Sequence, residues 1–563
     1  MDGAARGRAD GGNECTGVVD SGTRGGDEHT RWSQHALRGR LEGLEAVVRE
    51  RVTMEGHFKN SLLIVVIWSG LLASVSGCGP LPTETKPPSS FPLMAPSPTP
   101  LPTLAPLTFP SLPVETNLNV CQVAMRPGYE DECAALTDLP RYIMALEIDV
   151  ESRVIKGRER ILFVNREDIA LETIVLRLYA NLPPLRGGRN PYSGVKVDGI
   201  SIEGQEATFN YQAQNTAIAV RLPFPLAPGQ KATMELDFAV QLQADTDGIW
   251  QLTSFYPMLA IHDETGWRQD LSPIGDAVYS ESAFYTVYLT VPNDMVVVTS
   301  GVEVAAVENP EGTTTYLYCT GPVRDFALAI SEDFQVTSRV VDDITINVYY
   351  MAGDAEGEKV IECASETMAI FNRKFGFYPY AEFDVVVLPG FSGGTEYPGL
   401  IFISDRGNAD TEFLVAHEVA HQWWYGVVGN DILQEPWLDE AFAQYSAVIY
   451  FEERYGEEAA QEAFEGIRST YQRLIESGQD GPVGQSVWDF DNNVLYVSIV
   501  YNKGGVFLDA LRQEVGDEAF FAILQEHYRR YKYRVATGGD FLAVAEDVTG
   551  RELDELYDAW IRK

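Results

Sequence analysis

Two histidines and a glutamate form an H-E-x-x-H motif within the segment TEFLVAHEVAHQWWYG. The segment is rich in helix-favouring residues and closes on Gly426, so we predict a helix that ends there. Because a helix turns every 3.6 residues, His417 and His421 project from one face about 6 Å apart and can chelate one metal ion. Glu418 lies about 100° round the helix, beside the ion, where its carboxylate can take a proton from a metal-activated water. A metal-dependent hydrolase of peptides requires this set of residues.

A third ligand is expected from the next helix. The segment EPWLDEAFAQYSAVIYFEERYG has Pro436 in its first turn and Gly456 just past its end, as a helix prefers. Glu440 lies in that first turn, and the loop between the two helices lets them pack side by side. Two histidines and Glu440 would leave a fourth position for water, as catalytic rather than structural zinc requires.

The six cysteines contain no C-x-x-C pair, so a metal must be held by nitrogen and oxygen. Cys121 and Cys133 lie close together in a polar segment, where an exported protein could form a disulfide loop or keep two free thiols. Cys319 lies in a strand-like run and Cys363 on the apolar stripe of a helix-like segment. We expect both of these to be buried structural thiols.

The elements that position the motif belong to more than one folded unit, because 563 residues exceed what one hydrophobic core supports. Residues 140–335 contain runs rich in β-branched and aromatic residues between turn signals, which predict a β domain of sandwich or saddle type. Strands alternate with helical patterns over residues 336–563. The expected fold class is therefore α+β multidomain, with the motif in the second domain.

The formal net charge of -40 excludes a nucleic-acid binder, because a polyanion would be repelled. The acidity is typical of a solvated surface and identifies no substrate.

The N-terminal region predicts export. The apolar run SLLIVVIWSGLLASVS follows Lys59 and precedes Gly77 and Cys78. It is short for a membrane span, so we interpret residues 54–78 as a lipoprotein signal peptide, with an uncleaved anchor as the alternative. On this interpretation Cys78 is lipidated and holds the protein at the outer face of a bacterial cytoplasmic membrane.

Two flanking segments fit the same interpretation. Residues 1–53 lack sustained apolar periodicity, so we expect them to be untranslated, with Met54 as the start, or disordered. Residues 79–115 are rich in Pro, Ser and Thr and predict an extended tether. At about 3.1 Å per residue such a tether reaches about 110 Å.

The pattern HEVAHQWW followed by WLDEAFA resembles the zinc signature of the gluzincin metallo-aminopeptidases, the family of aminopeptidase N and leukotriene hydrolase. The run GGTEYPG resembles the family's Gly-x-Met-Glu-Asn loop, and VYNKGGVFLDAL resembles its catalytic tyrosine segment. The resemblance covers about residues 140–563. It implies a β domain followed by a thermolysin-like α/β catalytic domain, in a short member without the large C-terminal helical domain of many relatives.

The resemblance implies roles for further residues. Glu396 would bind the free α-amino group of a substrate. Tyr501 would donate a hydrogen bond to the oxyanion. The backbone of Gly393 and Gly394 would line the substrate strand.

Two features depart from the family pattern. Thr395 and Tyr397 stand where the family has Met and Asn on either side of the glutamate. The family also places a second polar anchor for the amine in the β domain, and the sequence does not decide among Gln251, Glu264 and Glu281.

The expected function is that of an aminopeptidase with one Zn²⁺ per chain, which hydrolyses N-terminal residues from peptides with a free N-terminus. A metalloendopeptidase built on the same site is the nearest alternative. A zinc-binding lipoprotein without turnover is the other. The presence of both Glu418 and Tyr501 argues against the latter, since a binding site needs neither a base nor an oxyanion donor.

Overall fold

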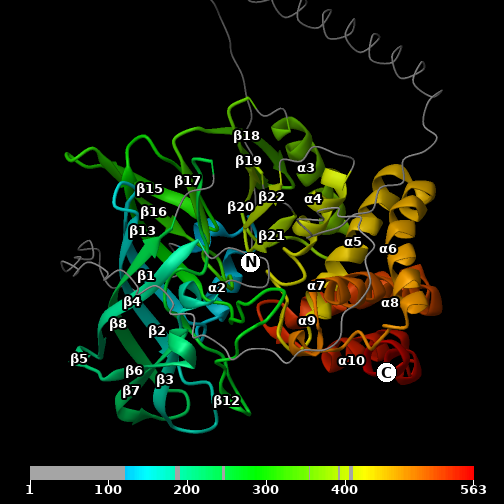
Figure 1. Ribbon diagram of the computed structural model, residues 1–563, viewed down its shortest axis with the longest axis horizontal. Coiled ribbons are helices and arrows are strands. Elements are labelled where there is room, and N and C mark those ends of the chain that lie inside the picture. The colour runs from blue at the N-terminus through cyan, green and yellow to red at the C-terminus, as the bar shows by residue number, and fades with distance from the viewer. Residues whose placement is uncertain (1–120, 184–190, 244–246, 354–355, 391–392, 405–409) are drawn as a thin grey trace, which may run out of the picture. The chain divides into compact units, whose positions relative to one another are not determined.

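The computed structural model describes residues 121–183, 191–243, 247–353, 356–390, 393–404 and 410–563. The predicted signal peptide at 54–78 with Cys78, the tether at 79–115 and residues 1–53 lie outside this part of the chain. The described chain consists of a β-rich domain followed by a domain in which helices predominate (Figure 1).

A large sheet with strand order β15-β16-β13-β1-β2-β8-β4-β5 is the frame of the β-rich domain. Side chains of its central strands alternate between buried and partly exposed positions, as in the run VIKGRERILFV of β2. This period of two turns one apolar face toward the core. The strands are β1 (Arg141–Asp149), β2 (Val154–Val164), β4 (Tyr192–Ile202), β5 (Gln205–Glu206), β8 (Lys231–Leu242), β13 (Phe284–Pro292), β15 (Val302–Glu308) and β16 (Thr313–Cys319).

Smaller sheets complete this domain, with orders β10-β3-β7-β6, β14-β17-β9 and β11-β12. Large and small sheets share one apolar core that includes Met144, Ile174, Val220 and Phe238. The strands are β3 (Leu171–Arg177), β6 (Phe209–Gln212), β7 (Ala217–Leu226), β9 (Trp250–Leu252), β10 (Met258–Leu259), β11 (His262–Asp263), β12 (Gly266–Trp267), β14 (Val296–Thr299) and β17 (Leu328–Ser331).

The second domain begins with a mixed sheet of order β18-β19-β20-β22-β21. Strands β19, β20 and β22 are parallel, while the outer pairs β18/β19 and β21/β22 are antiparallel. Strand β21 is the last in this order, so one of its edges has no strand partner in the described part of the sheet. The strands are β18 (Phe334–Val341), β19 (Ile344–Met351), β20 (Glu382–Leu388), β21 (Gly394–Tyr397) and β22 (Leu400–Ser404).

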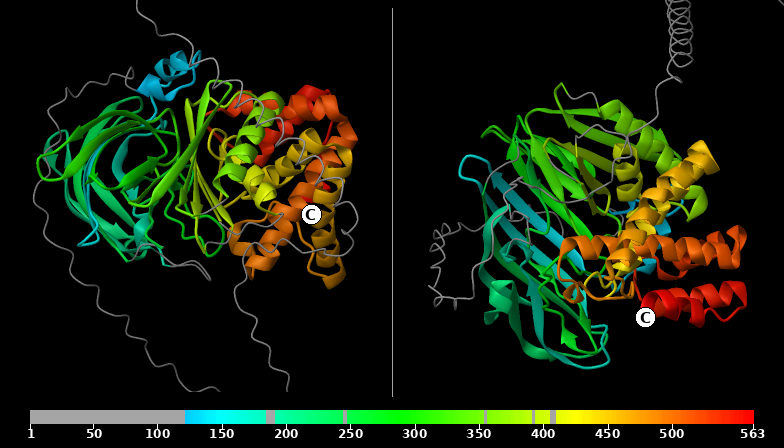
Figure 2. Two further views of the ribbon diagram at one scale, coloured as in Figure 1. Left: turned by 90° about the horizontal axis from the view of Figure 1, so that it is seen from above. Right: turned by 45° about the vertical axis from the view of Figure 1, so that its right-hand side comes forward.

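The helices of the second domain lie on the face of this sheet that is turned away from the β-rich domain (Figure 2). They end in a C-terminal bundle, and the two-stranded pair β23 (Gly429–Asn430) and β24 (Val535–Ala536) joins that bundle to the centre of the domain. The helices are α3 (Gly357–Lys374), α4 (Asp410–Ala420), α5 (Trp437–Tyr455), α6 (Glu457–Ser477), α7 (Asn493–Tyr496), η5 (Val497–Lys503), α8 (Gly504–Val515), α9 (Asp517–Tyr531), α10 (Gly538–Thr549), α11 (Asp554–Tyr557) and η6 (Asp558–Arg562).

A short segment before the β domain is also folded. It comprises η1 (Cys121–Ala124) and α2 (Glu130–Ala135), and Met125 forms a β-bridge with Tyr380 of the second domain. Cys121 and Cys133 are both buried free thiols, so the disulfide alternative is not observed. Cys319 and Cys363 are likewise buried, as expected.

One described segment, Asn493–Val515, is long and apolar enough to span a membrane by composition alone. Most of it is buried within the second domain. Its apolar character is thus explained by packing.

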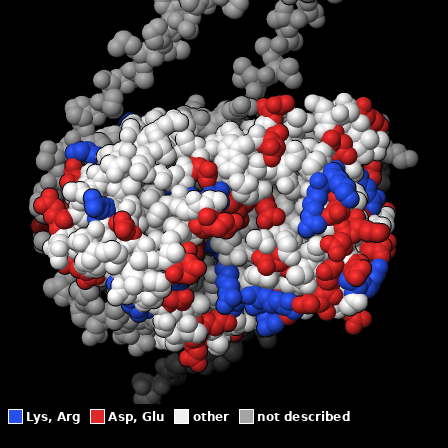
Figure 3. Space-filling view, turned by 90° about the horizontal axis from the view of Figure 1, so that it is seen from below, with Lys and Arg blue, Asp and Glu red and all other residues white. Residues whose placement is uncertain are grey.

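Acidic side chains are spread widely over one face of the molecule. On the face drawn in Figure 3, Asp and Glu side chains lie on both halves, with smaller groups of Lys and Arg beside them.

Candidate active site

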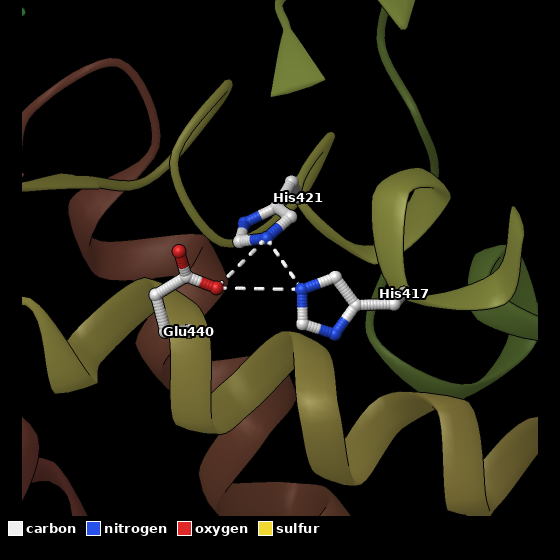
Figure 4. Close-up of side chains that lie close together, drawn as sticks. All are labelled: His417, His421 and Glu440. Atoms are coloured by element: carbon white, nitrogen blue, oxygen red, sulfur yellow. Dashed lines mark hydrogen bonds and ion pairs between the residues drawn. The ribbon is translucent and has the colours of Figure 1, made fainter. Parts of the chain in front are cut away.

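The three predicted metal ligands meet in the interior of the second domain. His417 lies in α4, His421 follows that helix directly, and Glu440 lies in the first turn of α5 (Figure 4). The Nε2 atoms of the two histidines are 3.1 Å apart, and each lies 3.3 or 3.4 Å from Oε2 of Glu440. A tetrahedral zinc ion about 2.0 Å from each ligand places the ligand atoms about 3.3 Å apart. The donor set therefore fits zinc.

The electrostatics of Glu440 and His417 also suit a cation. Burial alone would raise the pKa of Glu440, but the neighbouring imidazoles of His417 and His421 outweigh it and hold the pKa at about 2. Burial alone would lower the pKa of His421, but nearby carboxylates, first that of Glu396, outweigh it and raise the pKa well above its usual range, so a metal must displace a proton there. Burial lowers the pKa of His417. An ionised carboxylate and a neutral imidazole are the forms that bind a metal.

The prediction that the motif helix runs to Gly426 is wrong. Regular helix α4 ends at Ala420, and the N–H groups of residues 426–428 bond to carbonyls five residues earlier. This wider turn brings the carbonyl of Trp424 to 3.1 Å from Nδ1 of His421. Since a carbonyl only accepts, Nδ1 carries the proton and Nε2 is free for a metal.

The predicted base, Glu418, lies beside the triad rather than within it. Its carboxyl group is buried, and burial raises its pKa to about 8. A base with a pKa near the working pH is effective in proton transfer. A Cβ atom on Gly394 would lie 2.3 Å from this carboxyl group, so the space that Glu418 occupies depends on a glycine in β21.

Tyr501 reaches the site from a π-helical turn, η5, a geometry that is frequent at functional sites. Its hydroxyl donates a hydrogen bond to the Glu440 carboxylate. Its ring stacks on that of His417, with centroids 5.9 Å apart and planes 5° from parallel. The predicted oxyanion donor therefore lies at the metal triad.

Strand β21 brings Glu396 to the same place. Carboxyl oxygens of Glu396 and Glu418 and a ring nitrogen of His421 lie within 4.8 Å of one another. Gly393 precedes the strand with a φ of 95°, and its carbonyl accepts a hydrogen bond from the N–H of Ser404. Seven of the eight site residues that the sequence predicts thus lie around the triad, and the eighth, Gly393, directly precedes β21.

Sequence reasoning missed Asp276, which the β-rich domain supplies from the loop between β12 and β13. Its carboxyl group hydrogen-bonds with that of Glu396, and both lie within 4.8 Å of a carboxyl oxygen of Glu440. Burial raises the pKa of Asp276 to about 6. Nothing in the run SPIGDAVY marks the aspartate, because the loop has no periodicity and no motif.

The three residues considered earlier as the second amine anchor behave differently from one another. Gln251 lines the same cavity as Asp276 and Glu396. Glu264 is exposed, and Glu281 is paired with Arg166. Of the three, only Gln251 therefore lines the cavity in the described structure, together with Asp276.

Gln422, the residue after the motif, links it to the edge strand. Its side-chain oxygen accepts from the N–H of Gly399 at 2.8 Å, and its side-chain nitrogen donates to the carbonyl of Tyr397 at 3.2 Å. These bonds hold the β21/β22 hairpin, and thus Glu396, in a set position relative to the triad.

A cavity of about 310 Å³ opens beside Asp276 and Glu396. These two are the only acidic residues in its described lining, which is otherwise mostly aromatic and apolar. Its walls include Tyr179, Leu182, Tyr192, Val278, Tyr397 and Tyr425.

Comparisons with known proteins agree with this geometry. The profile of the peptidase family M1 domain matches residues 360–560. "Aminopeptidase 2" of Candida albicans is 22% identical over 65% of this chain and 42% of its own length. "Aminopeptidase N" of Streptomyces lividans is 27% identical over 38% of this chain and 26% of its own. This chain therefore spans less than half of the length of either relative.

A solved structure resembles the whole described fold. The M1 zinc metallopeptidase from Deinococcus radiodurans aligns with a TM-score of 0.59 and 22% identity, covering 75% of this chain and 93% of that one. This likeness bears on the fold, and the family profile bears on the domain that holds the triad. Residues 360–560 of this chain thus match the peptidase family M1 domain, and they follow a β-rich domain in a fold that is similar to that of an M1 zinc metallopeptidase.

Proposed function

We propose that the protein is a zinc-dependent aminopeptidase that removes N-terminal residues from peptides with a free amine. One observation carries the proposal. The second domain holds a triad that fits zinc. Carboxyl oxygens of Glu396 and Asp276 lie beside it, within 4.8 Å of a carboxyl oxygen of Glu440. A hydrolytic centre needs the triad, whereas the carboxyl pair has the chemistry to bind an ammonium group.

The zinc site is assigned to His417, His421 and Glu440, with one ion per chain. Zinc in such a site lowers the pKa of water and polarises a carbonyl group. Glu418 takes a proton from the attacking water and delivers it to the departing amine. The Tyr501 hydroxyl donates a hydrogen bond to the substrate carbonyl oxygen as negative charge develops there.

Strand β21 supplies the substrate track. The edge of β21 that has no strand partner among the described residues carries backbone donors and acceptors, including those of Gly394, to which an extended peptide can add as a further strand. Gly393 and Gly394 have no side chains to obstruct that approach. A peptide bound along this edge lies next to both Glu396 and Glu418.

The carboxyl pair determines which peptide bond is cut. An ammonium group held by Glu396 and Asp276 lies about one residue from the triad, so the first peptide bond is the one presented for hydrolysis. A charge-assisted hydrogen bond of this kind contributes about 1.5 to 3 kcal/mol. An endopeptidase gains nothing from such a pair, because an internal peptide N–H carries no charge.

The cavity beside the pair is assigned to the side chain of the first residue. Apolar cavities of about 150 Å³ hold a benzene ring, so about 310 Å³ accommodates a large aromatic or aliphatic group. A crystal structure of a mutant of the Deinococcus radiodurans protein holds a Tyr-Ser-Ala substrate, and structures of a two-domain M1 zinc metallopeptidase mutant hold L-tryptophan or L-arginine. We expect a preference for large first residues.

The test compares free and N-acetylated versions of one peptide with the purified protein, with and without a chelator. The proposal expects the free peptide to be cleaved far faster than the acetylated one, with cleavage lost on chelation and restored by zinc. Equal cleavage of both peptides would replace it with a metalloendopeptidase. Zinc binding without cleavage of any peptide would leave the non-catalytic alternative.

We also propose that the protein is an exported lipoprotein anchored through Cys78, with translation starting at Met54. The apolar run before Cys78 supports this, and the tether at residues 79–115 would hold the folded domains away from the membrane. Mass spectrometry of the native protein tests it. A mature chain that retains residues before Cys78 would contradict the lipoprotein interpretation.

A further inference from the structure

Arg324 is a buried cation at the junction of the two domains. It lies between β16 and β17 of the β-rich domain, and only 2% of it is exposed. In the described part of the chain, no carboxylate lies within ion-pair distance of its guanidinium group. Burying an unpaired charge is costly, so the hydrogen bonds that the group makes require an explanation.

The guanidinium of Arg324 binds three backbone carbonyls from separate segments. It donates to Ser280 of the β-rich domain at 2.9 Å, to Tyr425 after the metal-binding motif at 2.8 Å, and to Arg534 before β24. The planar guanidinium has five N–H donors and can bind carbonyls in three directions at once. A lysine ammonium on a flexible side chain does this less well.

The surrounding backbone leaves space for this group. A Cβ atom on Gly429 would lie 2.0 Å from the central carbon of the Arg324 guanidinium. Gly429 also donates its N–H to the Arg534 carbonyl that Arg324 binds. The position of the Arg324 guanidinium and the pairing of β23 with β24 therefore depend on each other.

Tyr425 is held in a conformation that non-glycine residues rarely adopt, with a φ of 124°. Its N–H donates to the carbonyl of Val428 at 2.8 Å, and its own carbonyl accepts from Arg324. Strained backbone costs about 1 to 3 kcal/mol and persists only where its surroundings enforce it. Arg324 is one of the groups that enforce it here.

The strained residue lies next to the carbonyl that orients a metal ligand. Trp424, directly before Tyr425, accepts the hydrogen bond from Nδ1 of His421 at 3.1 Å. A rotation of the backbone at Tyr425 would turn the Trp424 carbonyl away from the imidazole. The orientation of His421 is thus coupled to the arginine through one strained residue.

We propose that Arg324 is a positioning residue for the metal site, through which the β-rich domain fixes the segment 424–425 and so the direction of His421. The inference rests on the proposed zinc site. It assigns the β-rich domain a part in metal binding in addition to substrate recognition.

The test replaces Arg324 with Met or Lys in the full chain and measures zinc affinity by competition with a chelator. Partners that orient a metal-bound histidine are typically worth about 10- to 100-fold in affinity, so Arg324→Met should weaken zinc binding by at least about 10-fold. Arg324→Lys keeps the charge but not the fork, and should fall between this variant and the wild type.

Arg177→Met is the matched control. Arg177 is equally buried in the same domain and also donates to carbonyls, those of Arg268 and Asp270, but in the described structure it makes no hydrogen bond to segment 424–428. Its zinc affinity should stay within about 2-fold of the wild type. Equal weakening in the Arg177 and Arg324 variants would overturn the proposal, since general destabilisation would then explain both.

A second measurement, of the metal-site geometry, is used in case the Arg324→Met variant folds poorly. The visible absorption of the Co²⁺-loaded protein reports ligand geometry, and it should change for Arg324→Lys but not for Arg177→Met. Wild-type zinc affinity and an unchanged spectrum in both Arg324 variants would also overturn the proposal. Tight zinc binding by the wild type in the same titration would still support the proposed function.

Discussion

Two buried glutamates, one in each domain, have pKa values shifted in opposite directions. Glu440 in the metal site accepts a hydrogen bond from the Tyr501 hydroxyl, and its Oε2 atom lies 3.3 and 3.4 Å from Nε2 of His417 and His421; its pKa is about 2. Glu159 in β2 lies between Met144 of β1 and Leu236 of β8, and neither carboxyl oxygen has a hydrogen-bond partner in the described structure. Burial raises the pKa of Glu159 well above its usual range.

The difference shows what a buried carboxylate needs. Both side chains are almost fully excluded from solvent, so burial itself does not decide the charge. Positive or hydrogen-bonding partners keep Glu440 ionised and able to bind a cation, whereas Glu159 without them holds a proton. A buried acid is thus evidence for a site only when its partners are present.

Removing the well-partnered acid should have the largest effect. In Glu440→Ala we expect loss of zinc and of nearly all peptidase activity, because two imidazoles alone cannot hold the ion at working concentrations. Elemental analysis after dialysis measures the metal. A variant that keeps one zinc per chain would refute the ligand assignment.

Glu418→Gln should separate the role of a base from that of a metal ligand such as Glu440. The amide cannot accept the proton, so the rate of hydrolysis should fall by about 100- to 10,000-fold. Zinc content should match that of the wild type, because Glu418 is not a ligand. Turnover close to the wild-type rate would point to another base.

Glu396→Ala should affect recognition of the amine more than the chemical step. Loss of a charge-assisted contact predicts a fall of roughly 10- to 150-fold in kcat/KM for free-amine peptides. Cleavage of N-acetylated peptides should not fall with it, so most of the preference should disappear. Asp276→Asn tests the partner carboxyl group in the same way and should reduce the preference by a smaller factor.

Glu159→Met should give the smallest effect, and one of opposite sign. Replacing an unsatisfied buried acid by an apolar side chain of similar length should stabilise the fold by about 1 to 3 kcal/mol at pH 7. Chemical denaturation measures the change, and activity should be unaltered. Glu235→Met, on a neighbouring strand and partly exposed, is the control and should change stability little.

The pH dependence of this last effect has a defined sign. Because the folded-state pKa of Glu159 is raised, the unfolded chain releases the proton first as pH rises above about 4.3. The wild type therefore loses stability between about pH 4 and pH 7 relative to Glu159→Met. A stability difference that is constant across this range would mean that Glu159 is ionised in the folded protein.

The sequence alone determined the parts of the site that are local in the chain. Helical spacing is enough to place His417, Glu418 and His421, and a proline-started helix is enough to place Glu440, because the chemistry follows from residues one or two turns apart. The prediction of a β domain followed by a catalytic domain rested in the same way on periodicity within short segments.

Only the tertiary structure decided the contributions that come from distant segments. Asp276 and Arg324 lie in β-domain segments whose composition predicts turns and strands, and no periodic pattern relates them to the motif far along the chain. The segment after Ala420, where α4 ends, likewise makes a contact that the local preference for helix does not predict, the hydrogen bond from Arg324 to the Tyr425 carbonyl. Such features follow from the packing of one domain against the other, which local sequence patterns do not encode.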